Sequence, residues 1–195
     1  MKRIIVILLS ILSLSATAQE YLPQWQKGYL DFHSIATGQG ESTFIMMPDG
    51  TTMLVDAGDV DELWTKVHLP DSSKAPGEWI AHYMRHFSQS LRETGKADYF
   101  LLTHFHGDHV GGHLKSASGY LDVLKTVSFR NVIDRGWPSY DFPSYQNNVK
   151  YCPMLERYIS TVKGQVADGT KAEQFKIGSR KQIALQYEPK KYDFE

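Results

Sequence analysis

Four side chains that can bind a metal ion lie close together near the middle of the chain. Residues 104–109 read His-Phe-His-Gly-Asp-His. Imidazole and carboxylate groups are ligands that zinc prefers, and iron and manganese also accept them. One short loop cannot bring all four groups to one ion without strain. We therefore predict that His104 and His106 bind one ion and that Asp108 and His109 bind a second. The competing interpretation is a surface loop that is rich in histidine.

The elements around this loop favour the metal interpretation. Residues 99–102 are a short apolar run typical of a strand buried on both faces, a helix is expected to end near Leu124, and residues 126–133 read as another strand. A right-handed βαβ crossover places the carboxyl ends of both strands at one edge of the sheet. Asp134 ends the second strand at that edge. It either contacts a metal or substrate there or caps a turn before Gly136.

The rest of the chain predicts one mixed α/β (α+β) domain. Residues 29–35, 42–47 and 52–55 are β-rich and predict an antiparallel meander, and residues 78–94 have helical spacing that ends at Gly95. The chain has 195 residues, of which 42% are hydrophobic, enough for a sizeable core. Lys plus Arg total 21 and Asp plus Glu total 22, so no charge excess predicts nucleic-acid binding. The single cysteine, Cys152, can form neither an intramolecular disulfide nor a cysteine cluster.

The N-terminus predicts export. Lys2 and Arg3 precede an apolar run at residues 4–14, and Ala16-Thr17-Ala18 is a small-residue cleavage site. The run is too short to cross the bilayer, so we expect no transmembrane helix after cleavage. We therefore expect a signal peptide at residues 1–18, a domain at residues 19–195, and a periplasmic or extracellular location.

Through these motifs, the chain resembles the metallo-β-lactamase superfamily. The signature of that superfamily, His-x-His-x-Asp-His, is complete in residues 104–109, and residues 52–58 match its strand ending in Asp-x-Gly. Residues 33–42, followed by Pro-Asp-Gly at 48–50, resemble the opening of the hydrolase domain in competence-type DNA-uptake proteins. The resemblance covers about residues 29–134.

The resemblance implies a fold and a site. The fold is a four-layer αββα sandwich, of which this chain would supply the N-terminal half and the start of the second half. The site would hold two zinc ions, with iron or manganese as alternatives, and its shared water would have a pKa lowered towards about 7. Asp108 would be both ligand and catalytic carboxylate, orienting that water and passing a proton to the leaving group. Asp56 would fix the orientation of a ligand through hydrogen bonds.

The superfamily completes its site with ligands further along the chain, typically a histidine, an aspartate and a final histidine. No histidine follows His113 here, and residues 190–195 read as strand-forming without a terminal cap. We therefore expect the domain at 19–195 to be incomplete at its C-terminus and to turn over little substrate by itself.

The predicted function is an exported metal-dependent hydrolase that acts on a phosphodiester, a β-lactam or a lactone. The alternative is a secreted, non-catalytic binding module with a vestigial metal loop. The sequence leaves the oligomeric state open.

Two further features have competing interpretations. His82 and His86 lie four residues apart and either share a metal or sit on an exposed rim, and the aromatic segment 137–145 either walls a substrate cleft or packs on the domain.

Overall fold

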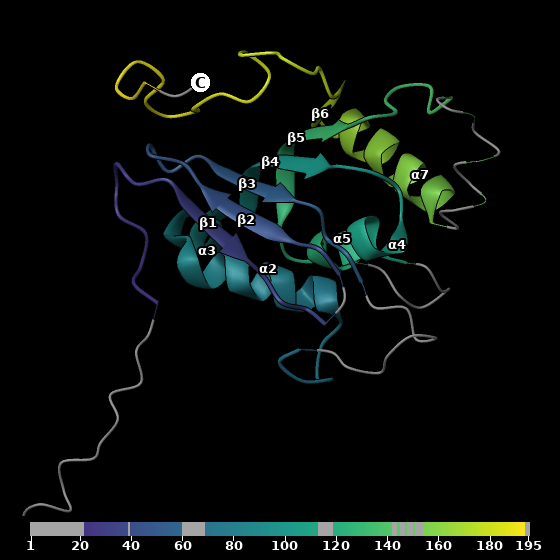
Figure 1. Cartoon of the computed structure of the whole chain (residues 1–195), viewed down its shortest axis with the longest axis horizontal. Helices are drawn as coiled ribbons and strands as arrows, with labels where there is room; N and C mark the ends of the chain where they lie inside the picture. The colour runs from purple at the N-terminus through teal and green to yellow at the C-terminus, as the bar shows by residue number, and fades with distance from the viewer. Residues whose placement is uncertain are drawn as a thin grey trace, which may run out of the picture.

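The computed structural model describes residues 22–38, 40–59, 69–112, 119–141, 144, 147, 150 and 154–193. It is built on one six-stranded sheet whose strands lie in chain order, with helices packed against it (Figure 1). The predicted α/β (α+β) class is confirmed. The predicted signal peptide and the residues His68, His113 and Cys152 lie outside the described residues. The strands are β1 (Asp31–Ser34), β2 (Thr43–Met46), β3 (Thr52–Val55), β4 (Lys96–Leu102), β5 (Ser128–Asp134) and β6 (Lys171–Gln174), and the helices are α2 (Pro76–Phe87), α3 (Gln89–Thr94), α4 (Gly107–Val110), α5 (Gly119–Val123) and α7 (Leu155–Ala167).

Strand pairing changes direction once across the sheet. β1, β2 and β3 pair antiparallel, which confirms the predicted meander. β3, β4, β5 and β6 pair parallel, and the chain from β4 to β5 passes through α4 and α5, as the predicted βαβ unit requires. The carboxyl ends of β3, β4 and β5 therefore meet at one edge of the sheet. That edge carries the histidine-rich loop.

One helical prediction needed correction. The single helix expected at residues 78–94 is two helices, α2 and α3, because Ser88 has an extended backbone (φ −108°, ψ 114°) and its side chain accepts a hydrogen bond from the backbone N–H of Leu91. Gly95 ends α3 in the left-handed conformation (φ 62°), as predicted. Helix α7 and strand β6 were not anticipated.

The main core lies on the face of the sheet that α2, α5 and α7 cover. Phe100 of β4 stacks on Tyr120 of α5 with ring centroids 4.2 Å apart, and Tyr120 in turn contacts Tyr158 of α7 at 5.5 Å. All three rings are almost fully buried. Burial of side chains of this size provides most of the favourable free energy of folding and fixes the helices on the sheet.

The C-terminal segment, residues 183–192, crosses the other face of the sheet (yellow in Figure 1). Leu185 packs there in a second core with Met53 and Tyr99. The backbone N–H groups of Tyr187 and Glu188 donate to Oδ2 of Asp49 at 2.8 and 2.9 Å. Residues 190–192 form a turn and a bend rather than the strand that the sequence suggested, and residues 194–195 lie outside the described residues.

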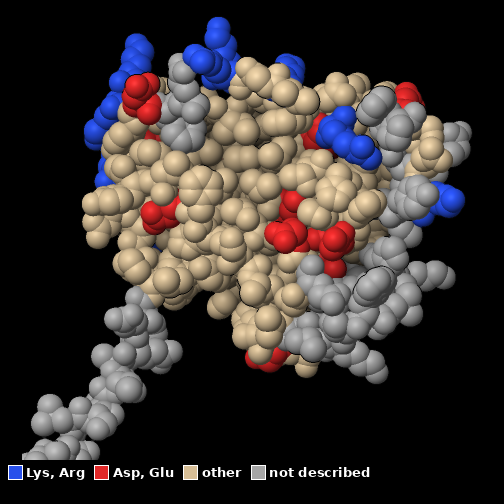
Figure 2. All heavy atoms as spheres, in the orientation of Figure 1, with Lys and Arg blue, Asp and Glu red and all other residues tan. Residues whose placement is uncertain are grey.

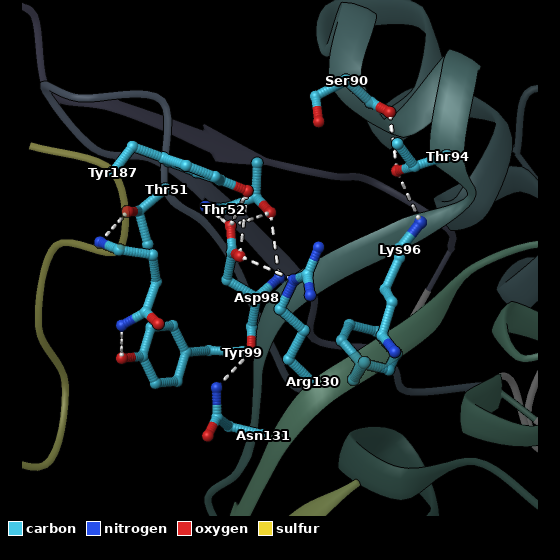
Figure 3. Close-up of polar contacts among 12 residues, drawn as sticks. Thr51, Thr52, Ser90, Thr94, Lys96, Asp98, Tyr99, Arg130, Asn131 and Tyr187 are labelled. Atoms are coloured by element: carbon cyan, nitrogen blue, oxygen red, sulfur yellow. Dashed lines mark hydrogen bonds and ion pairs between the residues drawn. The ribbon is translucent and has the colours of Figure 1, made fainter. Parts of the chain in front are cut away.

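Asp98 ties this segment to the sheet (Figure 3). The carboxylate is 1% exposed and accepts hydrogen bonds from the backbone N–H and hydroxyl of Thr52 at 2.9 and 3.1 Å. It also accepts one from the hydroxyl of Tyr187 at 3.1 Å, and Nε of Arg130 lies 3.3 Å away. These donors offset the cost of burying the carboxylate. Strands β3, β4 and β5 and the C-terminal segment are thus joined at one carboxylate.

None of the helices in the described part of the chain combines the length and the apolar character needed to span a membrane.

Asp49 generates a prediction about pH. Burial by itself raises the pKa of Asp49, but hydrogen bonds from the backbone N–H groups of Glu188, Thr51 and Tyr187 outweigh burial, so the net pKa lies below its ordinary value. A lowered pKa in the folded state means that the charged carboxylate stabilises the docked segment above the ordinary aspartate pKa, about 3.9. This stabilisation is lost as the pH falls through the lower pKa of the folded state.

We expect Asp49→Asn at pH 7 to lower the amide-exchange protection of Tyr187 and Glu188 by about tenfold, the scale of one charge-assisted hydrogen bond. Hydrogen exchange corrected for intrinsic rates measures this effect. Acidifying the unchanged protein below about pH 4 should lower the same protection. Asp71→Asn is the control, because Asp71 accepts the backbone N–H of Ser73 in an exposed turn of the same kind. Unchanged protection in Asp49→Asn would contradict the role assigned to this carboxylate.

Candidate metal site

Three of the predicted ligands come together as a group able to hold a metal ion. His104, His106 and Asp108 each offer one ligand atom, and these atoms all lie within 4.8 Å of one another. His106 is the N-cap of α4 and Asp108 lies in its first turn, so the strand-to-helix bend after β4 brings them together. His106 and Asp108 are exposed and His104 is partly buried. Two imidazoles and one carboxylate match the donor set of zinc, while the identity of the ion stays open.

His109, the fourth predicted ligand, lies beside this group. Its ring centroid is 3.8 Å from that of His104, and its Nε2 is 3.8 Å from Oδ2 of Asp108. Its other nitrogen, Nδ1, lies 2.7 Å from Oδ2 of Asp56. Because a carboxylate accepts there, Nδ1 is assigned the hydrogen, and Nε2 keeps a lone pair on the side of Asp108. The division of the four ligands, with His104 and His106 on one ion and Asp108 and His109 on a second, stays a prediction.

Asp56 contacts the loop at residues 104–109, called the metal loop below, as the resemblance implied. It follows β3 directly, is 4% exposed, and has a left-handed backbone with φ 57°. Besides His109, its carboxylate accepts the backbone N–H of Thr103 at 2.8 Å and the hydroxyl of Thr103 at 2.7 Å. The hydroxyl oxygen of Thr103 in turn lies 3.1 Å from Nδ1 of His104. One carboxylate therefore holds His109 directly and His104 through Thr103.

Thr103 was not singled out from the sequence. The available signal was a hydroxyl residue between a buried strand and a histidine, where a side chain can bond both to the preceding loop and to the ring.

The backbone behind the loop is packed too closely for side chains. The N–H of Glu41 donates to the carbonyl of Asp108 at 2.7 Å, and the N–H of Gly58 donates to the carbonyl of Glu41 at 2.9 Å. A Cβ placed on Gly58 would lie 1.8 Å from the carbonyl oxygen of Asp108, and one on Gly40 would lie 2.4 Å from the carbonyl carbon of Gly58. Three loops from distant parts of the sequence thus meet backbone to backbone, and glycine is required at the contact.

The surroundings suit a cation. Burial lowers the pKa of His104, and the neighbouring His109 and His106 lower it further. A lowered pKa leaves this imidazole neutral near pH 7, which is the form that binds a metal. Figure 2 shows acidic side chains gathered on this face of the molecule, in the region of the loops around α4.

Asp134 lies at the same sheet edge, but both of its carboxylate oxygens accept hydrogen bonds from groups outside the metal group. Its Oδ1 accepts the backbone N–H groups of Gly136 and Trp137, both at 2.7 Å, and its Oδ2 accepts the hydroxyls of Tyr140 and Tyr158, both at 2.9 Å. Burial and then the charge of Asp134 raise the pKa of both tyrosines, so they remain protonated donors. These contacts favour the turn-capping alternative over a contact with metal or substrate.

The two other sequence features fall outside the metal group. His82 and His86 are exposed on α2, and the metal-binding group found among the described residues does not include them. In the aromatic segment, Tyr140 is buried against Phe105, which favours packing. Phe142, Pro143 and Tyr145 lie outside the described residues.

Comparisons of this chain with protein-family models, with curated proteins and with solved structures found no match.

The contact at Gly58 generates a prediction. Gly58→Ala places a methyl group against the carbonyl of Asp108, so we expect a loss of about 3 kcal/mol in the free energy of unfolding. Urea unfolding measures it. Gly164→Ala is the matched control, because nothing lies within 4 Å of a Cβ at this position in α7. Alanine there should stabilise the protein by about 0.5–1 kcal/mol. Equal effects of the two substitutions would contradict the close packing described for Gly58.

Asp56 generates a second prediction. Asp56→Asn keeps the shape of the side chain but turns an NH₂ group towards either His109 or Thr103. We expect zinc affinity to fall about 10- to 100-fold, as when a group supporting a ligand is lost. Competition with a chromophoric chelator at pH 7.5 measures the affinity. Asp168→Asn, at the exposed C-cap of α7, is the control and should leave the affinity unchanged. An affinity within twofold of the unchanged protein in Asp56→Asn would rule out the supporting role.

Proposed function

We propose that this protein is an exported, metal-dependent hydrolase of the metallo-β-lactamase superfamily. The observation that carries the proposal is the group of His104, His106 and Asp108, with ligand atoms within 4.8 Å, at the carboxyl edge of parallel strands. Active sites of α/β proteins lie at this edge. The complete His-x-His-x-Asp-His motif and the Asp-x-Gly motif before it supply the superfamily assignment.

The donor set fits zinc, and iron or manganese are the alternatives. His104, His106 and Asp108 would hold one ion, and His109 with Asp108 would contribute to a second. Asp56 supports this arrangement because its hydrogen bond to Nδ1 leaves Nε2 of His109 available as a ligand atom. Bound zinc supplies Lewis acidity, which makes a water molecule more acidic and polarises the substrate oxygen.

The residues of the chain have distinct tasks in this proposal. Asp108 is the exposed carboxylate of the group, so it could take a proton from the attacking water and then donate that proton to the leaving group. Asp56 is buried and orients His109 without contacting substrate. The backbone contacts of Glu41 and Gly58 hold the loop in place before substrate arrives, which lowers the cost of assembling the site.

We propose the four-layer αββα sandwich as the fold to which this sheet belongs. Support for it comes from the sheet, which carries helices on one face and apolar side chains such as Met53 and Tyr99 on the other. A sheet with two apolar faces is suited to a layered core. The substrate class follows from the resemblance alone, and a phosphodiester, a β-lactam and a lactone are the candidates.

The second candidate is a secreted, non-catalytic binding module in which the metal loop is vestigial. It is favoured by the fact that the metal-binding group found in the described part of the chain consists of three side chains from a single loop. Metal content and turnover separate the two candidates.

We expect purified residues 19–195 to bind at least one equivalent of zinc, measured by elemental analysis after dialysis. Asp108→Asn should lower that stoichiometry or affinity, and Asp168→Asn should not. Any hydrolysis of bis-p-nitrophenyl phosphate, nitrocefin or a lactone by this protein should be lost on chelation. Less than one equivalent of zinc, iron or manganese would contradict the metal site. The same result would favour the binding module.

A further inference from the structure

A cavity of about 400 Å³ lies beside helix α2, outside the metal loop. Trp79, His82, Tyr83 and His86 line it from α2, where the spacing i, i+3, i+4, i+7 puts them on one face of the helix. The opposite wall is largely apolar and includes Ser34 beside Leu22, Ile35, Ala36, Leu69 and Pro70. The volume is within the range of pockets that bind small molecules.

Contacts with strand β1 and within α2 hold the α2 side of the cavity in place. The hydroxyl of Tyr83 lies 3.0 Å from Nδ1 of His33 in β1. The His33 ring also packs 4.8 Å from the ring of Phe87, and the rings of Tyr83 and Phe87 are 4.7 Å apart. Burial lowers the pKa of His33, although Asp31 opposes the shift, so the ring is neutral at pH 7. The cavity is therefore preformed rather than assembled by the ligand.

A second hollow, of about 450 Å³, adjoins the first and is positively charged. The two hollows share His82 and His86. Lys74, Arg85 and Arg92 line the second one, and Glu78 is its only carboxylate among the described residues. The carboxylate of Glu78 is already bonded to the backbone N–H of Ala75 and to Lys125. The charge that remains attracts an anion.

Arg85 is the cation that a ligand can use. Nε of Arg85 is buried and has no hydrogen-bond partner among the described residues. Arg92, by contrast, donates to the backbone carbonyls of Arg85 and His86 at the end of α2. Lys74 lies over the ring of Trp79, with Nζ 4.4 Å from the ring centroid. The side chain of Arg85 lines the second hollow, so the outer part of its guanidinium can form a charge-assisted pair with a bound carboxylate.

We propose that this face of α2 binds a small amphipathic carboxylate. The apolar chain of the ligand occupies the cavity between Trp79 and Leu69, and the carboxylate lies against Arg85. A guanidinium binds a carboxylate through two parallel hydrogen bonds, which fixes the orientation of the ligand. The site is separate from the metal loop and does not depend on the proposed hydrolase activity.

Isothermal titration calorimetry with dodecanoate tests the proposal, using the protein with and without zinc. We expect saturation at one equivalent and the same affinity in both preparations. Arg85→Gln should weaken binding about tenfold or more, because it removes a charge-assisted pair. Ala36→Trp should abolish binding, because Ala36 is exposed at the cavity wall and the larger side chain fills the space. Lys163→Gln, an exposed change of the same charge on α7, is the control and should leave the affinity unchanged.

Dodecyltrimethylammonium, which has the same chain and the opposite charge, should bind at least tenfold more weakly than dodecanoate. The proposal is overturned if dodecanoate does not saturate, if the cationic probe binds equally well, or if Arg85→Gln and Lys163→Gln have equal effects. Circular dichroism identifies any variant that has not folded. Because Ala36→Trp and Arg85→Gln change different parts of the site, either variant alone tests the proposal. Dodecanoate binding that persists after zinc removal distinguishes this site from the metal loop.

Discussion

The metal loop rests on a contact between backbones. Gly58 lies so close to the carbonyl of Asp108 that no Cβ fits between them, and the N–H of Glu41 donates to the same carbonyl. This packing therefore fixes how three segments lie relative to one another, namely the loop after β1, the loop after β3 and the first turn of α4. Histidines in an open loop would each lose conformational entropy on binding a metal. In this protein, folding has already removed much of that conformational entropy. The geometry of the candidate ligands therefore follows from the packing of the sheet edge.

Asp56 connects this packing to the electrostatics of the site. Its buried carboxylate holds Thr103 and His109, and the three donors that it accepts offset the cost of burying its charge. The same contact selects the tautomer in which Nε2 of His109 can bind a metal. The left-handed backbone at Asp56 places the carboxylate there. Local strain at a non-glycine residue is typical of functional positions, where the surrounding structure maintains it.

The sequence predicted features that depend on short spacings and missed those that depend on distant contacts. The spacing of His104, His106 and Asp108 indicated the candidate ligands, and β-rich and apolar runs located strands β1 to β5. The break at Ser88 was missed because apolar residues continue at helical spacing on both sides of it, while the hydroxyl caps a new helix. Helix α7 has a weaker apolar stripe than α2. The packing at Gly58 joins residues more than forty positions apart in sequence, and no local pattern reveals it.

The central claim is that folding of the sheet edge presents imidazoles and a carboxylate to one metal centre. X-ray absorption spectroscopy at the zinc edge of the zinc-loaded protein tests it most directly. The account predicts two or three imidazole ligands at about 2.0–2.1 Å, a carboxylate oxygen at about 2.0–2.2 Å and no sulfur ligand. A spectrum with only oxygen ligands, or with a sulfur neighbour from Cys152, would contradict it.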